Sequence, residues 1–122
     1  MYSRSAANAY RRVDLESAPK YQIVDRLYER FARDVEEARN AIHSKDISGK
    51  AKALDHALCI AVELKAALDF EAAPALCANL EALYDFVITR IGQCNASLQL
   101  RPLDQAAKIM AELAIAFHEA PK

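Results

Sequence analysis

The fold of this chain is decided by a stretch that opens with six apolar residues in a row, Ala57-Leu58-Cys59-Ile60-Ala61-Val62, and runs through Glu63-Leu64 and Leu68-Asp69 to Asn79-Leu80-Glu81-Ala82-Leu83-Tyr84-Asp85. Successive residues of a helix are about 100° apart, so consecutive apolar side chains point all around its axis. A helix in a small soluble bundle buries one stripe and keeps its other side in water. We therefore expect this stretch to keep apolar surface after its core stripe is buried, and we interpret that surface as a docking site.

The composition of the whole chain predicts a single helical domain. The chain has 122 residues, of which 53% are hydrophobic and 27% are charged, which is enough for one buried core. Two glycines and four prolines are too few for a turn-rich β fold, whereas the many Ala, Leu, Glu, Lys and Arg residues favour helices. The formal net charge is -1 and charges of both signs are interspersed along the chain, which argues against nucleic acid as a partner.

The chain shows no targeting or membrane-spanning pattern. Its first residues, Met1-Tyr2-Ser3-Arg4-Ser5, hold no apolar core of a signal peptide, and no apolar run approaches the roughly 20 residues that cross a bilayer. We therefore expect a cytoplasmic protein without membrane insertion. Cys59, Cys77 and Cys94 form no CxxC pair and fall inside helical patterns. In a reducing compartment we expect buried free thiols, with disulfide, metal-binding or catalytic roles as alternatives.

The spacing of apolar residues predicts four helices, at about 19–43, 49–68, 74–96 and 100–118, after an N-terminal arm at 1–16. Ser17 is placed to cap the first helix and Ser48 the second, while Pro74 separates the second helix from the third and Pro102 opens the fourth. Short connections make consecutive helices antiparallel neighbours. The sequence thus predicts an all-α fold, an antiparallel up-down-up-down four-helix bundle, in which residues 1–122 form one domain.

Each predicted helix carries a stripe of apolar residues, three or four apart, that we expect to face the core. The stripes are Val24, Leu27, Tyr28, Phe31, Val35, Ala38 and Ile42; Leu54, Ala57, Ala61, Leu64 and Leu68; Leu76, Leu80, Leu83, Val87, Ile91 and Cys94; and Leu103, Ala106, Met110, Leu113 and Phe117. Asp34 falls among the charges assigned to the wet face of the first helix. Leu58, Cys59, Ile60 and Val62 lie off the second stripe, and Tyr84 and Ile88 flank the third.

Residue patterns that carry catalysis are absent from the sequence. There is no HExxH motif, no Gly-rich phosphate loop and no GxSxG elbow. His56 and Cys59, three residues apart on a helix, are two potential ligands, and two ligands do not make a metal site. We therefore expect a protein that is not an enzyme and uses no metal or cofactor, with a small metalloenzyme at His56 and Cys59 as the alternative.

The positive signal is the apolar excess of the second to fourth helices. We expect a partner-binding surface at Leu58, Cys59, Val62, Leu80, Tyr84 and Ile88, with Tyr10 of the arm covering it when it is empty. A few hundred Å² of apolar surface supplies several kcal/mol of gross driving force at roughly 25 cal/mol per Å². That suffices to hold an amphipathic helix in a groove. Homodimerisation and tight self-burial of an Ala-rich helix are the alternatives.

The order of several short motifs gives a family resemblance. The motifs are Met1-Tyr2, Ala9-Tyr10, Val13-Asp14-Leu15-Glu16-Ser17-Ala18-Pro19, Leu27-Tyr28, Ala41-Ile42, Asp46-Ile47, Glu63-Leu64, Leu68-Asp69, Glu71, Asn79-Leu80, Leu83-Tyr84-Asp85, Asn95 and Leu103-Asp104. Together they resemble the flagellin-specific export chaperones, the FliS-type secretion chaperones, along the full chain. The sequence departs from the family at Glu29-Arg30, at the turn Glu71-Ala72-Ala73-Pro74, and at Phe117, where the family usually has Trp.

The resemblance implies a cytoplasmic chaperone with an antiparallel four-helix bundle. Members of that family bind the disordered C-terminal segment of flagellin, which becomes helical on contact, prevent its premature polymerisation, and present it to the export gate of the flagellar type III secretion system. The family's N-terminal arm lies over part of the binding surface, and some members contact a further flagellar regulator. We expect these partners here, with the chain itself a monomer or weak homodimer. The alternative is a helical homodimerisation or adaptor module.

Overall fold

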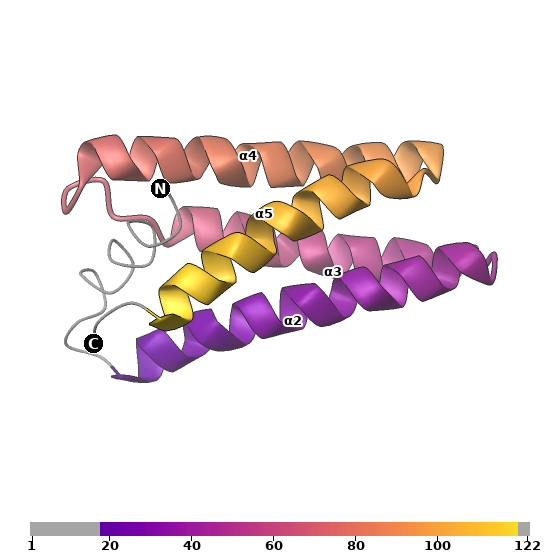
Figure 1. Ribbon diagram of the computed structural model, residues 1–122, viewed down its shortest axis with the longest axis horizontal. Helices are drawn as coiled ribbons and strands as arrows, with labels where there is room; N and C mark the ends of the chain where they lie inside the picture. Colours follow the sequence, from indigo (N-terminus) through magenta and orange to yellow (C-terminus); the bar gives the residue numbers. More distant parts are fainter. Residues whose placement is uncertain (1–17, 120–122) are drawn as a thin grey trace.

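The structure is a computed structural model that describes the backbone of residues 18–119 and the side chains of residues 22–119. Within these residues it contains four helices, α2 (Ala18–His43), α3 (Ile47–Ala66), α4 (Pro74–Ser97) and α5 (Leu100–Glu119), and no strand (Figure 1). The predicted all-α fold is confirmed, and the helix bounds agree with the predicted ones to within two residues. The predicted arm at 1–16, with Tyr10, lies outside the described residues.

The four helices form an antiparallel up-down-up-down bundle, as the short connections predict. Each helix packs on the next one along the chain, and α5 closes the ring by packing on α2. Figure 1 shows α5 crossing from the end of α4 to the beginning of α2. The α2–α3 and α4–α5 connections therefore lie at one end of the bundle, and the α3–α4 connection lies at the other. None of the helices within residues 18–119 is both long enough and apolar enough to cross a membrane.

The start of α3 corrects one expected cap. The Asp46 side chain, not that of Ser48, caps this helix, because its Oδ1 accepts the Gly49 N–H at 2.9 Å. The helix consequently begins at Ile47, two residues before the predicted start. A Cβ at position 49 would collide with the Asp46 carboxylate, so the glycine makes room for the cap.

The core confirms most of the predicted stripes and corrects that of the third helix. Tyr84 is fully buried, whereas Leu83 only packs against the edge of the core. Tyr84 lies four residues after Leu80 and three before Val87, so it occupies the inward turn between them. Its hydroxyl is 2.8 Å from the hydroxyl of Tyr28, and this hydrogen bond links α4 to α2 across the bundle. Ile60 is also buried, at 3% exposure, although the sequence placed it off the stripe of its helix.

All three cysteines are free thiols, and two of them are buried as expected, while the third is exposed. Cys77 and Cys94 are buried, whereas Cys59 is exposed on α3. The Cys77 thiol donates a hydrogen bond to the Asp69 carbonyl at 3.2 Å. Burial is the main cause that raises the pKa of both Cys77 and Cys94, because it disfavours the charged thiolate. These two thiols are therefore core residues with low nucleophilicity.

Candidate functional site

An ion pair marks the line along which α3 meets α4. The Lys65 ammonium lies 2.6 Å from Asp85 Oδ1 and joins the two helices at an exposed position. The hydrogen bond to Asp85 is the main cause that raises the pKa of Lys65; desolvation lowers it, and the charges of Asp85 and Glu81 raise it further. The Lys65 ammonium therefore stays charged at neutral pH, and the ion pair provides a reference point for the register of the two helices.

Helical spacing from this ion pair defines an apolar seam. On α3, Val62 and Leu58 lie three and seven residues before Lys65, on the same side of the helix. On α4, Ile88 and Gly92 lie three and seven residues after Asp85, again on the same side. Because the helices are antiparallel, equal spacing from the ion pair puts Val62 level with Ile88 and Leu58 level with Gly92. We call these four residues the α3–α4 seam.

The seam exposes apolar side chains beside the open space at Gly92. Val62 is 48% exposed, and Leu58 and Ile88 are half-buried against the core. A Cβ placed on Gly92 would meet nothing within 4 Å. Glycine inside a helix costs about 1 kcal/mol relative to alanine, and no positive φ requires it at this position. The fold gives no internal reason for this glycine, and its effect is to leave the α4 backbone open to close approach.

The structure separates the residues that the sequence assigned to one binding surface. Leu58, Val62 and Ile88 lie together on the seam, while exposed Cys59 lies on the side of α3 that faces α2. Leu80 and Tyr84 are 0% exposed, so their assignment to a surface is corrected. Both belong to the 3/4 row that packs into the bundle, one helical step from the seam. Gly92 was missed, although an isolated glycine within a helical pattern was the available signal.

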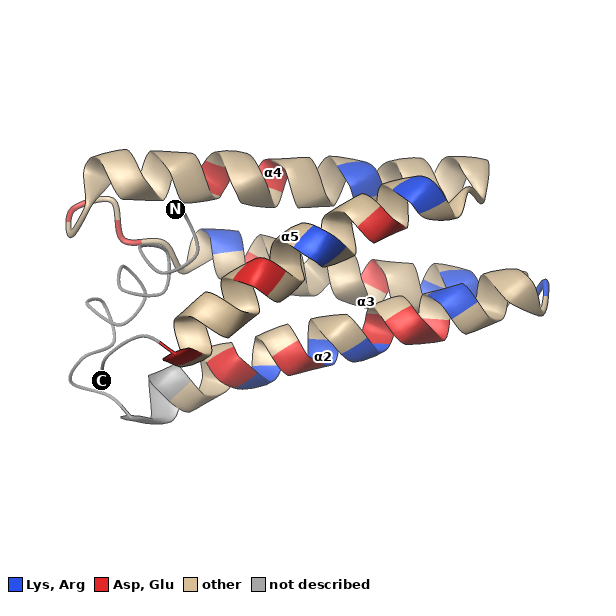
Figure 2. Cartoon of the chain, viewed as in Figure 1, with Lys and Arg blue, Asp and Glu red and all other residues tan. Residues whose placement is uncertain are grey.

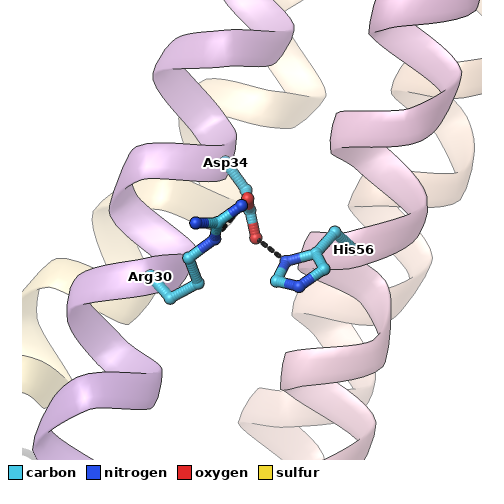
Figure 3. Close-up of polar contacts among 3 residues, drawn as sticks. All are labelled: Arg30, Asp34 and His56. Atoms are coloured by element: carbon cyan, nitrogen blue, oxygen red, sulfur yellow. Dashed lines mark hydrogen bonds and ion pairs between the residues drawn. The ribbon is translucent and has the colours of Figure 1, made fainter.

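Apart from the seam, a cavity lies between α2 and α3, on the side where Cys59 is found. It has a volume of about 780 Å³ and is lined mainly by polar and charged residues. Asp34 lies at its base and is fully buried, which corrects its assignment to the wet face of the first helix. Its Oδ1 accepts a hydrogen bond from Arg30 Nε at 3.2 Å, and its Oδ2 accepts one from His56 Nδ1 at 2.5 Å (Figure 3).

The polar contacts of this cavity tie two helices together. Arg30 and Asp34 come from α2 and His56 from α3, so the buried carboxylate is satisfied from both sides (Figure 3). Cys59 lines the same cavity one turn after His56. Within residues 22–119, no three His, Cys, Asp or Glu side chains are grouped so that they could hold a metal ion. The arrangement is therefore explained as a structural link between α2 and α3.

Four antiparallel helices with an exposed apolar seam between two of them define a small all-α bundle domain. Comparison with known proteins gives the family. The chain matches the family model of the flagellar protein FliS over residues 2–122, and it belongs to this family of flagellar secretion chaperones.

Individual relatives agree with this assignment. The chain is 30% identical to the flagellar secretion chaperone FliS of Salmonella typhimurium, over 98% of this chain and 92% of the relative. It is 28% identical to that of Vibrio cholerae, over 97% and 90% of the two chains, and 27% identical to FliSB of Pseudomonas aeruginosa, over 93% of each. The resemblance seen in the sequence motifs is confirmed.

Proposed function

We propose that this chain binds the disordered C-terminal segment of flagellin, keeps it from polymerising prematurely, and delivers it to the flagellar export apparatus. The single observation that carries the proposal is the α3–α4 seam, where Val62 stands exposed and Gly92 leaves the backbone open. Membership of the flagellar secretion chaperone family supplies the kind of cargo, since flagellin is the substrate that the family resemblance implies.

The seam suits a segment that becomes helical on contact. An amphipathic segment cannot bury its apolar side alone, and the row of Leu58, Val62 and Ile88 offers apolar contacts at helical spacing. The missing side chain at Gly92 allows a helix to approach the α4 backbone closely, and the Lys65–Asp85 ion pair supplies polar groups at the edge of the seam. Ordering the flagellin segment costs roughly 2–5 kcal/mol, which keeps the affinity moderate and permits release at the export gate.

The N-terminal arm completes the proposal. We propose that residues 1–16 cover part of the seam through Tyr10 in the absence of flagellin, which would lower the apparent affinity by the fraction of covered molecules. Deletion of residues 2–16 should therefore raise both the binding of a dye that reports exposed apolar surface and the affinity for flagellin. If the deletion changes neither quantity, the arm does not cover the seam.

The proposed function is tested by titrating the full chain with a C-terminal segment of flagellin from the same organism. We expect a one-to-one complex in calorimetry and a gain of helical circular dichroism beyond the sum of the two components. In a second assay, a stoichiometric amount of the chain should delay polymerisation of full-length flagellin. A flagellin segment that stays unbound and unstructured at millimolar concentration would reject the proposal. Sedimentation in the same samples separates it from the homodimer alternative, in which dimers persist with flagellin present.

A further inference from the structure

The fold sorts charges that are interspersed in the sequence. The end of the bundle that carries the α3–α4 connection is predominantly acidic, and the opposite end, with the α2–α3 and α4–α5 connections, holds most of the basic residues of the described chain among acidic ones (Figure 2). The end with the α2–α3 connection contains Arg33, Arg39, Lys45, Lys50, Lys52, Arg90, Arg101 and Lys108 against Asp34, Glu36, Glu37, Asp46, Asp55 and Asp104. The acidic end contains Asp25, Glu29, Glu63, Asp69, Glu71, Glu81, Asp85, Glu112 and Glu119 against Arg26, Arg30 and Lys65. The bundle is therefore electrostatically polar along its axis.

The end with the α2–α3 connection also holds an apolar cavity. Its volume is about 410 Å³, and it is lined by Ala41, Ile42, Ile47 and Leu98 together with Lys45, Asp46 and Lys50. The buried Lys50 ammonium donates to the Asn95 carbonyl at 3.2 Å and Asp46 caps α3, so Lys45 is the exposed cation at the cavity. Ile47 is 70% exposed and Leu98 is 50% exposed. A cavity of roughly 150 Å³ is enough to hold benzene, so this one has room for an aromatic side chain. Its lining predicts an occupant with an apolar tip and a negative charge placed toward Lys45.

Two residues that line the cavity have a left-handed backbone conformation, which glycine usually adopts. Lys45 follows α2 with φ 59°, and Leu98 ends α4 with φ 62°. The turns themselves serve the helices, since the Asp46 and Leu98 N–H groups are bonded to carbonyls of α2 and α4. Those hydrogen bonds require only the backbone, and glycine would make them without left-handed strain. The lysine and leucine side chains are thus not explained by helix termination.

The acidic end carries a segment with the complementary chemistry. In the α3–α4 connection, Phe70 is 40% exposed and stands between Asp69 and Glu71. The Asp69 carboxylate accepts the Glu71 N–H at 3.0 Å, which holds the tip of this connection in a tight turn. The connection therefore presents an aromatic ring between two carboxylates, which is the chemistry that the cavity at the opposite end predicts.

We propose that copies of this chain associate weakly end to end, with Phe70 of one copy in the apolar cavity beside Lys45 of the next. Asp69 and Glu71 would then lie near Lys45, and the acidic end of one bundle would meet the end of another that holds most of the basic residues. The contact uses neither Leu58 nor Val62, so it goes beyond the proposed function and leaves the α3–α4 seam free. Each copy offers one plug, Phe70, and one cavity. The interface therefore joins two different surfaces, and further copies can add at both ends of a row.

A single aromatic anchor with a few charges is smaller than the interface of a permanent dimer. We therefore expect a dissociation constant of roughly 100 µM, weakening with added salt because the attraction includes charges near the surface. Sedimentation velocity of the full chain between about 10 µM and 1 mM measures this directly. The average sedimentation coefficient should rise with concentration, and the rise should shrink in high salt.

Two variants make the test specific to the proposed contact. Phe70→Ser removes the plug, and Ile47→Asp puts a carboxylate in the cavity wall at the first residue of α3, where negative charge favours the helix. Each variant alone should stay monomeric at concentrations where half of the wild type is associated. An equimolar mixture should associate again but stop at the dimer, because only the cavity of the first variant and the plug of the second remain intact. Ile115→Ser, at an exposed apolar position elsewhere on the acidic end, should behave as wild type.

The outcomes separate the proposal from its competitors. A wild-type chain that stays monomeric to 1 mM would overturn it, and so would variants that associate as the wild type does. A mixture that fails to associate, although each variant alone has lost association, would indicate a symmetric contact and would also overturn it. Flagellin binding measured on the same two variants should equal that of the wild type, so failure here and failure of the proposed function are distinguishable.

Discussion

A charge placed on the α3–α4 seam should damage flagellin binding far more than it damages the fold. Val62 is 48% exposed, whereas Leu64, two residues later on the same helix, is fully buried. Full burial of a valine side chain contributes about 1.5–3 kcal/mol, so Val62→Asp should lower the free energy of unfolding by only about 1 kcal/mol. Leu64→Asp buries an unpaired carboxylate in the core and should cost more than about 4 kcal/mol, which is much of the stability of a domain of this size.

The effect on binding follows from the same geometry. In the complex, the carboxylate of Val62→Asp would be covered by the apolar side of the flagellin helix without a partner, which costs about 2–3 kcal/mol or more. The dissociation constant should therefore rise by roughly 30- to 150-fold. Urea denaturation measures the fold, and calorimetric titration with the flagellin segment measures binding. Ile23→Asp, on α2 at 50% exposure, is the matched control and should leave the affinity unchanged. Equal losses of affinity in both variants would refute the assignment of the seam.

Three further predictions concern the interior. Tyr84→Phe removes the 2.8 Å hydroxyl contact with Tyr28 and should lower stability by about 1 kcal/mol; a double-mutant cycle in urea that finds no coupling would contradict it. Asp34→Ala leaves Arg30 and His56 without their shared carboxylate and should cost about 2–4 kcal/mol, so a loss below about 1 kcal/mol in the same assay would be inconsistent with a structural link. Iodoacetamide should label Cys59 first, because the raised pKa of Cys94 keeps that thiol protonated; mass spectrometry that finds Cys94 alkylated first would disprove it.

The same thiols predict a pH dependence of stability. The pKa of Cys77 and of Cys94 is raised in the folded chain, so the folded state keeps these protons at a pH at which the unfolded state has lost them. Their contribution is fully present below the ordinary thiol pKa of 9.0 and is lost as the pH rises through the folded values. This alkaline loss should be smaller in Cys94→Ala than in the wild type when both are unfolded in urea at pH 8 and pH 10. An unchanged loss would show that other groups cause it.

The helices and their order could be predicted because their signals are local. The 3/4 apolar spacing, Pro74 and the short connections each depend on neighbouring residues, and the structure follows them to within two residues at each helix end. The cap of α3 was misassigned because Asp46 and Ser48 are both capable capping residues. Only the backbone at Gly49 decides between them, and that choice is not visible in the pattern.

The polar interior and the seam depend on contacts between helices. Asp34 was assigned to water by its charge, but it sits three residues after Phe31 and four before Ala38, and His56 reaches it from α3. No pattern within one helix contains that contact. Leu83 and Tyr84 are adjacent, and the apolar spacing fits either of them as the inward residue. The buried one is Tyr84, whose hydroxyl is hydrogen-bonded to that of Tyr28 on another helix. The opposition of Leu58 and Gly92 likewise needs the register that the Lys65–Asp85 ion pair reveals.

Methyl NMR of the full chain during titration with the flagellin C-terminal segment tests the central claim most directly. The claim predicts that the methyl resonances of Leu58, Val62 and Ile88 shift and saturate at a one-to-one ratio, while those of Ile23 and Ile115, on α2 and α5, keep their positions. Binding that leaves the three seam residues unshifted, or that shifts Ile23 and Ile115 instead, would contradict it.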